Sequence, residues 1–415
     1  MKIAVIGAGI VGITTAYELA IDGHQVTLLE KASSAAVASS FATAGVISPG
    51  LMQHLSHPTW SRGGWFSGLR GANQFNMGRQ TTLADIQWLR QWKTRRGTDR
   101  ALQDALHTHR LIEFSQRQLS ATALATKIEF ERSEGVLVLA NTNGDLQAVQ
   151  KKAGILKNWG VAVRSITPEE IAKIEPSLQT TGGFVGAIYL PGDEVGNCRQ
   201  FALHLKNELQ SMGVQVRFDT MVLNIQSGTQ PRIHLKNQAA PMEFDHIVVC
   251  SGTNTRALLQ DLKIKLPMAT VSSYSLSARI KEELNAPRSA VYSVSDCTTI
   301  VRMGNRVRVS HGAELGTPTE KHDERSVQHL YQCLQKYFPG AADYSGGLQV
   351  WKGAFALMAD GLPVVGQSAL PNLWLNLGHG PNGWAMACGA AKCIADAIGN
   401  RTPSIEIAPY DPLRF

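Results

Sequence analysis

The sequence predicts an α/β protein with a Rossmann-like dinucleotide-binding domain and a second, α+β domain built on an antiparallel sheet. Three observations lead to this fold class. The chain begins with a buried strand, a glycine-rich turn and a helix, and residues 246–255 repeat an apolar strand that runs into a glycine turn. Between residues 267 and 312 strands alternate with turns, as is typical of an antiparallel sheet.

The first 30 residues contain the strongest motif. An apolar run at 3–6 indicates a parallel strand, and Gly7, Gly9 and Gly12 follow it at G-x-G-x-x-G spacing. In such a motif the first glycine permits a tight turn, the second lets a pyrophosphate approach the backbone, and the third lets helix and strand pack closely. The helix N-terminus offers free N–H donors to the phosphates. A second strand ends in Glu30, where a carboxylate accepts hydrogen bonds from an adenosine ribose.

The remaining elements follow from apolar periodicity and from turn residues. In order, we expect helices over 80–125, a strand at 136–140, helices at 145–158 and within 166–176, a loop or hairpin at 190–198, and a helix at 199–211. Strands at 214–218, 221–225, 233–235 and 246–249 come next, the last in the same parallel sheet as the N-terminal strand. A hairpin around Gly304 and Asn305, a helix at 320–337, and a final strand, glycine-rich loop and helix complete the chain.

Length and composition bound the class of protein. A chain of 415 residues suggests two domains or one large composite one. No apolar run is long enough to cross a bilayer. The six cysteines form no C-x-x-C pair, so neither a metal site nor a disulfide framework is indicated, which favours the reducing cytoplasm.

A basic stretch at 88–100 leaves two interpretations open. It holds Arg90, Lys93, Arg95, Arg96 and Arg100 beside Trp88 and Trp92. The favoured interpretation is a solvated helix end whose tryptophans lie in the core. The alternative is a patch that meets anionic lipid headgroups, with peripheral contact at the inner face of a membrane. No fold signature supports nucleic-acid binding, and the sequence does not predict an oligomeric state.

Six motifs in order resemble the FAD-dependent D-amino-acid dehydrogenase (small subunit) family, within the wider D-amino-acid-oxidase-like superfamily. They are IGAGIVGITTAYELA, SFATAGVISPG, LPGDEVGNC, IVRMGNRVRV, DGLPVVG and LGHGPNGW. The resemblance implies FAD as cofactor and a small amino acid or amine as substrate. It also implies a discontinuous FAD-binding domain of residues 1–80, 143–180, 197–265 and 346–415, and a substrate domain of residues 81–142, 181–196 and 266–345.

The family motifs also place the cofactor on this sequence. The resemblance implies that the N-terminal turn binds the ADP half, that residues 39–47 run beside the pyrophosphate and isoalloxazine, and that the late glycine loop lies at the pyrimidine edge of the flavin. Val222 matches a backbone contact to adenine. The residues implied to contact FAD are Gly7, Gly9, Ile10, Val11, Gly12, Glu30, Lys31, Ser39, Ser40, Ala44, Gly45, Val46, Ile47, Val222, Ser251, Gly252, Gly378, His379, Gly380, Asn382, Gly383 and Trp384.

At Phe355 the sequence departs from the family pattern in a way that bears on the substrate. Family members transfer a hydride from Cα to flavin N5, and an arginine suits the task of gripping the substrate carboxylate because its fork pairs with both oxygens. Phe355 stands where that arginine aligns. Either the carboxylate is held elsewhere, by Arg302 or Lys352, or the substrate has changed. We favour a changed substrate, such as a secondary or cyclic amine or a more apolar amino acid.

Five further polar side chains are candidates for the pocket. Tyr274 matches a family tyrosine, with a packed core residue as the even alternative, and His379 is expected to act through its backbone. His311 stands where the family has glycine, and His54 and His57 follow the flavin segment.

The expected function is therefore FAD-dependent oxidative deamination, with a quinone or respiratory carrier as acceptor. The alternatives are an oxygen-using oxidase of a secondary or cyclic amine, and a flavin-binding protein that has lost amino-acid activity.

Overall fold

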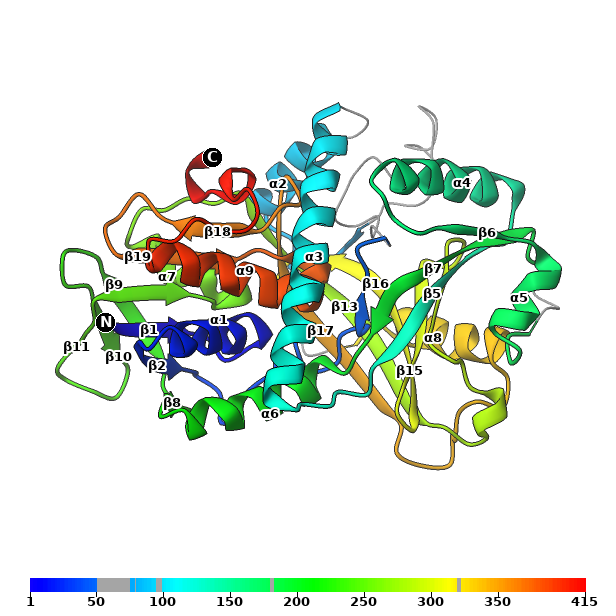
Figure 1. Ribbon diagram of the computed structural model, residues 1–415, viewed down its shortest axis with the longest axis horizontal. Helices are drawn as coiled ribbons and strands as arrows, with labels where there is room; N and C mark the ends of the chain where they lie inside the picture. The colour runs from blue at the N-terminus through cyan, green and yellow to red at the C-terminus, as the bar shows by residue number, and fades with distance from the viewer. Residues whose placement is uncertain (51–74, 79, 95–98, 180–182, 319–321) are drawn as a thin grey trace.

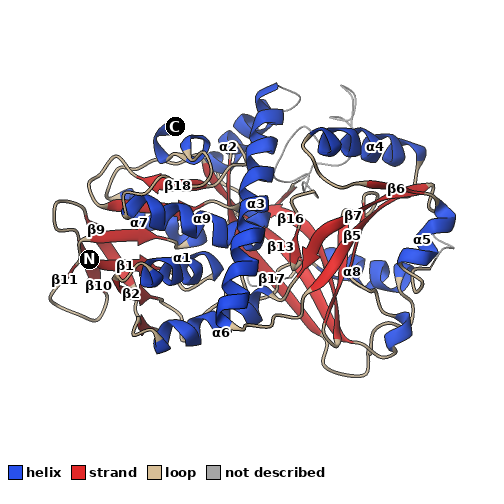
Figure 2. Ribbon diagram, in the orientation of Figure 1, coloured by secondary structure: helices blue, strands red, loops and turns tan. Residues whose placement is uncertain are grey.

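The computed structural model describes residues 1–50, 75–78, 80–94, 99–179, 183–318 and 322–415. Two sheets lie side by side, and the long helix α3 (Asp99–Thr126) stands at the boundary between them (Figure 1). One half holds a mostly parallel sheet and the other a large, curled, mostly antiparallel sheet, as the strands of Figure 2 show. The predicted α/β fold with a second α+β part is thereby confirmed.

The first sheet has the order β18-β19-β12-β1-β2-β8. Its members are β1 (Lys2–Ile6), β2 (Gln25–Leu29), β8 (Gln215–Arg217), β12 (His246–Val249), β18 (Val364–Gln367) and β19 (Leu373–Leu377). β1 pairs in parallel with both β2 and β12, so the two predicted strand-to-glycine turns end at the same edge. Helices α1 (Ile10–Ile21) and α9 (Gly383–Ile398) pack against each other on one face, beside α6 (Cys198–Ser211).

The second sheet has the order β17-β13-β16-β15-β14-β5-β7-β3, with β4 on β16 and β6 on β7. Its strands are β3 (Val46–Ile47), β4 (Asn76–Met77), β5 (Ser133–Ala140), β6 (Arg164–Ile166), β7 (Gly186–Val195), β13 (Met268–Arg279), β14 (Ala290–Ser293), β15 (Thr298–Met303), β16 (Arg306–Leu315) and β17 (Gln349–Met358). Helix α8 (Glu324–Tyr337) covers one face, where its apolar residues join those of β13 and β16 in one core.

Three smaller strands and four further α-helices belong to the described structure. The strands β9 (Val222–Gln226), β10 (Arg232–Leu235) and β11 (Met242–Glu243) form a separate sheet. The helices are α2 (Leu83–Thr94), α4 (Asn143–Asn158), α5 (Pro168–Ile174) and α7 (Thr255–Gln260). Thr142 and Asp145 form a capping box that starts α4, so this helix begins two residues before the predicted start.

One expectation is wrong. The predicted loop or hairpin at 190–198 is largely strand, because β7 extends to Val195 and pairs with β5 on both sides of a bulge at residues 191–193. The predicted domain boundaries stay a prediction. Within the segments predicted for the cofactor domain, β6 pairs with β7, α4 packs on β5 and β7, and β17 pairs with β13 of the second sheet. Pairing with a buried neighbour satisfies the backbone of these segments, and sequence order alone does not reveal it.

The tryptophans of the basic stretch lie in the core. Trp88 and Trp92 are 3% and 1% exposed, and both pack edge-on against Phe75. The favoured interpretation of a solvated helix with core tryptophans is confirmed for α2, and Arg95 and Arg96 lie outside the described residues. Among the described residues, no helix is both long enough and apolar enough to span a membrane.

Glu18 on α1 is a buried carboxyl group with a measurable consequence. Burial raises its pKa from 4.5 to about 7, although Lys392 on α9 lies 3.9 Å away. The folded state therefore favours the protonated form more than the unfolded state does. The ionised carboxylate destabilises the fold progressively as pH rises from about 4.5 to 7, by about 3 kcal/mol at most.

We expect Glu18→Gln to raise Tm at pH 8 and to leave it nearly unchanged at pH 5, because the amide is neutral at both values. Thermal unfolding across this pH range measures the effect. Glu113→Gln is the matched control, since the Glu113 side chain is 51% exposed. An equal gain in Tm at both pH values would contradict the assignment.

Candidate functional site

A cavity of about 1070 Å³ lies where the two sheets meet. Its wall includes the first turn of α1, the segment after β2, the loop before α9, and strands β13, β15, β16 and β17. The volume is at the upper end of the usual range for ligand sites, about 300–1,000 Å³. The cavity therefore joins the predicted nucleotide turn to the predicted substrate sheet in one continuous space.

The N-terminal turn is built so closely that only glycine fits. A Cβ on Gly12 would lie 1.8 Å from the Gly7 carbonyl oxygen, and one on Gly7, where φ is +107°, would lie 2.7 Å from the Cys250 carbonyl oxygen. Gly9 begins α1 without a side-chain cap, which leaves amide donors at the helix start. Glu30 accepts hydrogen bonds from the Ala8 and Ala32 amides at 2.7 and 2.9 Å.

The segment from Ser39 to Ile47 crosses between the two sheets. Ser40 Oγ accepts a hydrogen bond from the Ile10 amide at 3.0 Å, at the first turn of α1. At its other end Val46 pairs with Val195 in β7. Between them the Thr43 carbonyl accepts a hydrogen bond from the Arg308 guanidinium at 2.9 Å. The segment is thereby held by both halves of the molecule, along the edge of the cavity.

The loop before α9 closes the cavity on the side of the first sheet. Gly378 and Gly380 have positive φ, and a Cβ on either would lie 2.7 Å from a side chain of β17. Between them lies His379, whose backbone bridges to Leu357. Burial lowers the pKa of His379 to about 3, so its ring is neutral throughout the physiological range. This property suits a packing group and rules out a base that works near neutral pH.

The predicted catalytic residues do not all reach the cavity. Phe355 and Tyr274 line it, but the Tyr274 hydroxyl donates to Glu314 at 2.7 Å and accepts from the Asp323 amide at 3.2 Å. Burial, followed by the bond to Glu314, raises the pKa of Tyr274. Arg302 is not among the described residues of the cavity wall, and its guanidinium pairs with Glu283 at 3.1 Å. The structure therefore brings Arg302 to the far end of the β15–β16 hairpin.

Lys352 is also engaged. Its ammonium lies 3.1 Å from the Glu314 carboxylate and 5.3 Å from the centre of the Tyr274 ring. The side chain is 5% exposed, and Lys352 is absent from the described cavity wall. Tyr274, Glu314 and Lys352 therefore form a buried polar cluster in the second sheet. The negative charge of the Glu314 carboxylate is already paired with the Lys352 ammonium.

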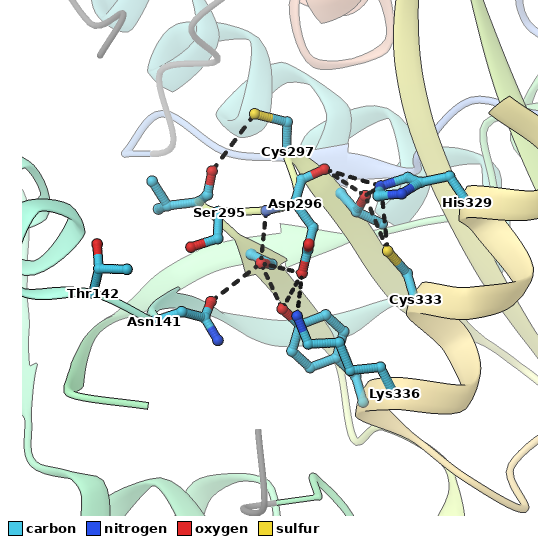
Figure 3. A network of polar contacts seen from close by, with 12 residues as sticks. Asn141, Thr142, Ser295, Asp296, Cys297, His329, Cys333 and Lys336 are labelled. Carbon is cyan, nitrogen blue, oxygen red and sulfur yellow. Dashed lines mark hydrogen bonds and ion pairs between the residues drawn. The ribbon is translucent and has the colours of Figure 1, made fainter. Parts of the chain in front are cut away.

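His311 belongs to a network that ties the β14–β15 turn to α8. Figure 3 shows the Asp296 side chain of the turn beside Lys336 of the helix, which also carries His329 and Cys333, while the Cys297 sulfur points away from the helix. Asp296 accepts hydrogen bonds from Lys336, at 2.9 Å, and from Tyr337. His311 Nδ1 lies 3.3 Å from the Cys297 carbonyl oxygen, and its ring centre lies 4.2 Å from that of His329. Burial, followed by His329, lowers the pKa of His311.

The other predicted cofactor residues divide into two groups. Those that line the cavity are Gly9, Ile10, Val11, Ser39, Ser40, Ala44, Gly252, Gly378, His379, Gly380, Gly383 and Trp384. Those that are not part of the described wall are Gly7, Gly12, Glu30, Lys31, Gly45, Val46, Ile47, Val222, Ser251 and Asn382. His54 and His57 lie outside the described residues.

Sequence reasoning missed the neighbours of Phe355 on β17. Trp351 and Gly353 line the cavity with it, at intervals of two residues. Side chains of a strand alternate between faces, so assigning a strand to 349–358 would have identified both from Phe355 alone. Ser310 on β16, which lines the cavity, was missed as well, as was Arg308 two residues before it on the same face, and alternation along that strand was the available signal.

Comparisons with known proteins agree on one family. The family DAO, described as FAD dependent oxidoreductase, matches residues 2–397. A D-amino acid dehydrogenase from Chromohalobacter salexigens is 30% identical over 422 residues, which cover 100% of both chains. Glycine oxidase from Geobacillus kaustophilus has a TM-score of 0.76 at 20% identity, and the match covers 100% of this chain and 99% of that one. L-proline dehydrogenase from P. horikoshii has a TM-score of 0.73 at 17% identity, covering 100% and 97%. The last two likenesses show the fold.

The cavity fits the FAD that this family binds. At the cavity wall lies the glycine turn, where an added Cβ would collide with the backbone. Helix α1 begins there without a side-chain cap. The wall also contains buried polar atoms without a hydrogen-bond partner among the described residues, and those beside the first sheet are Asn376 Oδ1, His379 Nε2 and Trp384 Nε1. Unpaired buried polar atoms are destabilising, so a polar ligand that pairs with them accounts for their presence.

We expect Gly12→Ala to lose bound FAD, because its Cβ would force β1 and α1 apart at the first turn. Flavin absorbance per chain after purification measures the loss. Gly154→Ala is the matched control, since a Cβ added to this α4 glycine would have nothing within 4 Å. Full flavin content in a folded Gly12→Ala protein would contradict the role of the turn.

Proposed function

The chain belongs to the DAO family of FAD-dependent oxidoreductases, and on that premise we propose that it oxidises the C–N bond of a D-amino acid or a related amine. The observation that supports this function best is the single cavity joining the N-terminal glycine turn, the His379 loop and the Phe355 wall. The full-length relative named as a D-amino acid dehydrogenase supports the choice of an amino acid among amines.

We propose a role for each predicted cofactor residue from its position. The Val11 amide binds the pyrophosphate at the start of α1, where the helix dipole favours negative charge, while the Ile10 amide donates to Ser40 Oγ beside it. Glu30 binds the adenosine ribose through the carboxylate lone pairs that its two backbone bonds leave free. Val222, Lys31, Ser251 and Gly252 flank the adenosine end. Bound FAD supplies the acceptor for the hydride from the substrate Cα, at N5.

The rest of the cofactor site lies at the flavin end. We propose that Ser39, Ser40 and the segment Ala44, Gly45, Val46 and Ile47 follow the pyrophosphate to the ring. The loop of Gly378, His379, Gly380, Asn382, Gly383 and Trp384 lies at the pyrimidine edge. The N-terminus of α9 then stabilises negative charge on the reduced ring, because α9 begins at Gly383 with no side-chain cap.

The contacts of Arg302 and Lys352 support a changed substrate. Both were candidates to hold a carboxylate in place of the missing arginine, yet each pairs with a glutamate and neither lines the described cavity wall. Phe355 packs with Val271, Leu357 and Trp88 in an apolar cluster. We propose that the protein acts on a secondary or cyclic amine or on a more apolar amino acid, rather than on a small D-amino acid held by an arginine.

We propose a quinone or another carrier as the electron acceptor, on the family resemblance. Asn76, Asp99 and Leu102 of the cavity wall are exposed, and exposed Met77 lies beside Asn76. We propose that an apolar acceptor approaches the ring from this side. The rival function, an oxidase that uses oxygen, shares the fold and differs in acceptor.

We expect the purified protein to be yellow and its colour to be bleached under nitrogen by an amine of this class. The bleached flavin should regain its colour faster with a quinone or a dye than in air. Stopped-flow absorbance at the flavin band measures both steps. Rapid, stoichiometric peroxide formation would favour the oxidase, and a loaded flavin that no amine bleaches would favour loss of activity.

We expect Phe355→Arg to raise kcat/KM for D-alanine by about tenfold or more. A desolvated ion pair of this kind contributes about 2–5 kcal/mol, so even a poorly placed guanidinium should improve carboxylate binding. Steady-state kinetics with an artificial dye measures the change. Phe355→Leu is the matched control, because it alters the ring without adding charge. No rise in D-alanine turnover would disprove the proposed role of this position.

A further inference from the structure

A row of hydrogen-bonding side chains crosses the wall of the second sheet. Trp351 on β17 lies directly opposite Ser275 on β13, Ser275 opposite Ser310 on β16, and Ser310 opposite Thr299 on β15. Residues directly opposite in neighbouring strands share one face of a sheet. Trp351, Ser310 and Thr299 line the cavity, and Ser275 lies between Trp351 and Ser310 on the same face without being part of the described wall.

Three polar atoms of this row lack partners. Ser275 Oγ, Ser310 Oγ and Trp351 Nε1 are buried and have no hydrogen-bond partner within the described ranges. Each is a donor, and the indole N–H can do nothing but donate. Buried polar atoms are paired in nearly all native structures, so three unpaired donors in one row point to a ligand with acceptor atoms.

Arg308 adds positive charge beside the row. It precedes Ser310 by two residues on β16 and therefore shares its face. The guanidinium donates to Ser277 Oγ at 2.8 Å and to the Thr43 carbonyl oxygen, and no carboxylate pairs with it in the part of the chain that the structure describes. Burial lowers the pKa of Arg308 to about 10, so it stays charged at neutral pH.

A buried cation without a paired anion favours an anion nearby. The titratable groups that act on Arg308 across space are Arg306, which opposes its charge, and Cys198 and Glu131, which support it. Ser277, its hydrogen-bond partner, follows Ser275 by two residues on β13, so the guanidinium lies next to the serine pair. The positive charge of Arg308 and the unpaired donors of the row therefore both favour a negatively charged ligand group with acceptor atoms.

We propose that Trp351, Ser275, Ser310 and Thr299 form a carboxylate subsite, with Arg308 as the adjacent positive charge. This rests on the proposed function and names its substrate class, an amino or imino acid whose carboxylate is held by neutral donors. Trp351 precedes Phe355 by four residues on β17, about 13 Å along the strand. The carboxylate therefore binds well away from the Phe355 position.

Binding to the FAD-loaded protein tests the subsite without turnover. Pyrrole-2-carboxylate is the probe, because its ring carbon carries no hydride to transfer, and pyrrole-2-carboxamide is its neutral counterpart. Titration of the flavin absorbance gives Kd for each. We expect Ser310→Ala and Ser275→Ala each to weaken carboxylate binding about tenfold, as loss of a hydrogen bond to a charged group does, and to change carboxamide binding by less than about threefold.

Two control variants sharpen the result. Ser272→Ala removes another buried, unpaired hydroxyl of β13, three residues from Ser275 and so on the opposite face, and should bind the carboxylate as wild type does. Lys152→Gln removes an ammonium on the α4 side of the cavity and should also leave binding unchanged. Flavin content and Tm confirm that each variant folds.

Several outcomes would overturn the subsite. They are wild-type Kd in both row variants, equal losses for carboxylate and carboxamide, no carboxylate binding by the wild type, or loss of binding in Lys152→Gln alone. The anaerobic bleaching of the wild type by amines tests the proposed function separately. Bleaching with unaffected carboxylate binding in the row variants rejects the subsite and keeps the function.

Discussion

The anchoring of residues 40–46 to both sheets is the constraint on which the cavity depends. At one end Ser40 accepts the Ile10 amide of α1, and at the other Val46 pairs with Val195 of β7. The Arg308 guanidinium holds the Thr43 carbonyl between them. These bonds fix the spacing between a parallel sheet that ends in glycine turns and a curled sheet that supplies the opposite wall. Without this crossing segment, these bonds between the two walls of the cavity would be absent.

Burial determines the chemistry that the cavity offers. His379 loses its capacity to bind a proton near neutral pH because it is wholly enclosed, and the Tyr274 hydroxyl is committed to Glu314. The described wall of β13, β16 and β17 thus holds hydroxyls, an indole N–H and an aromatic ring, with the guanidinium of Arg308 beside it. Such a wall can position a substrate and exclude water. Positioning is the main requirement for hydride transfer from an amine to a bound flavin.

Local chemistry explains how much of the site was predictable. Gly7, Gly9, Gly12 and Glu30 follow from spacing, since a strand, a tight turn and a helix need those residues in that order. The role of the late loop around His379 came from the resemblance of LGHGPNGW to the family motif. Arg302 shows the limit of such reasoning. Its position on a hairpin was correct, but its direction depends on Glu283, which lies nineteen residues away in the chain.

The sequence by itself determined the elements, the glycine turns and the family, because each depends on residues close together in the chain. Tertiary structure alone decided that β6 and β17 join the second sheet, that Lys352 is neutralised, and that four side chains from β13, β15, β16 and β17 align in one row. The physical reason is strand register. Which residue lies opposite another is set by pairing between distant segments, and a shift of one position would turn every side chain to the other face.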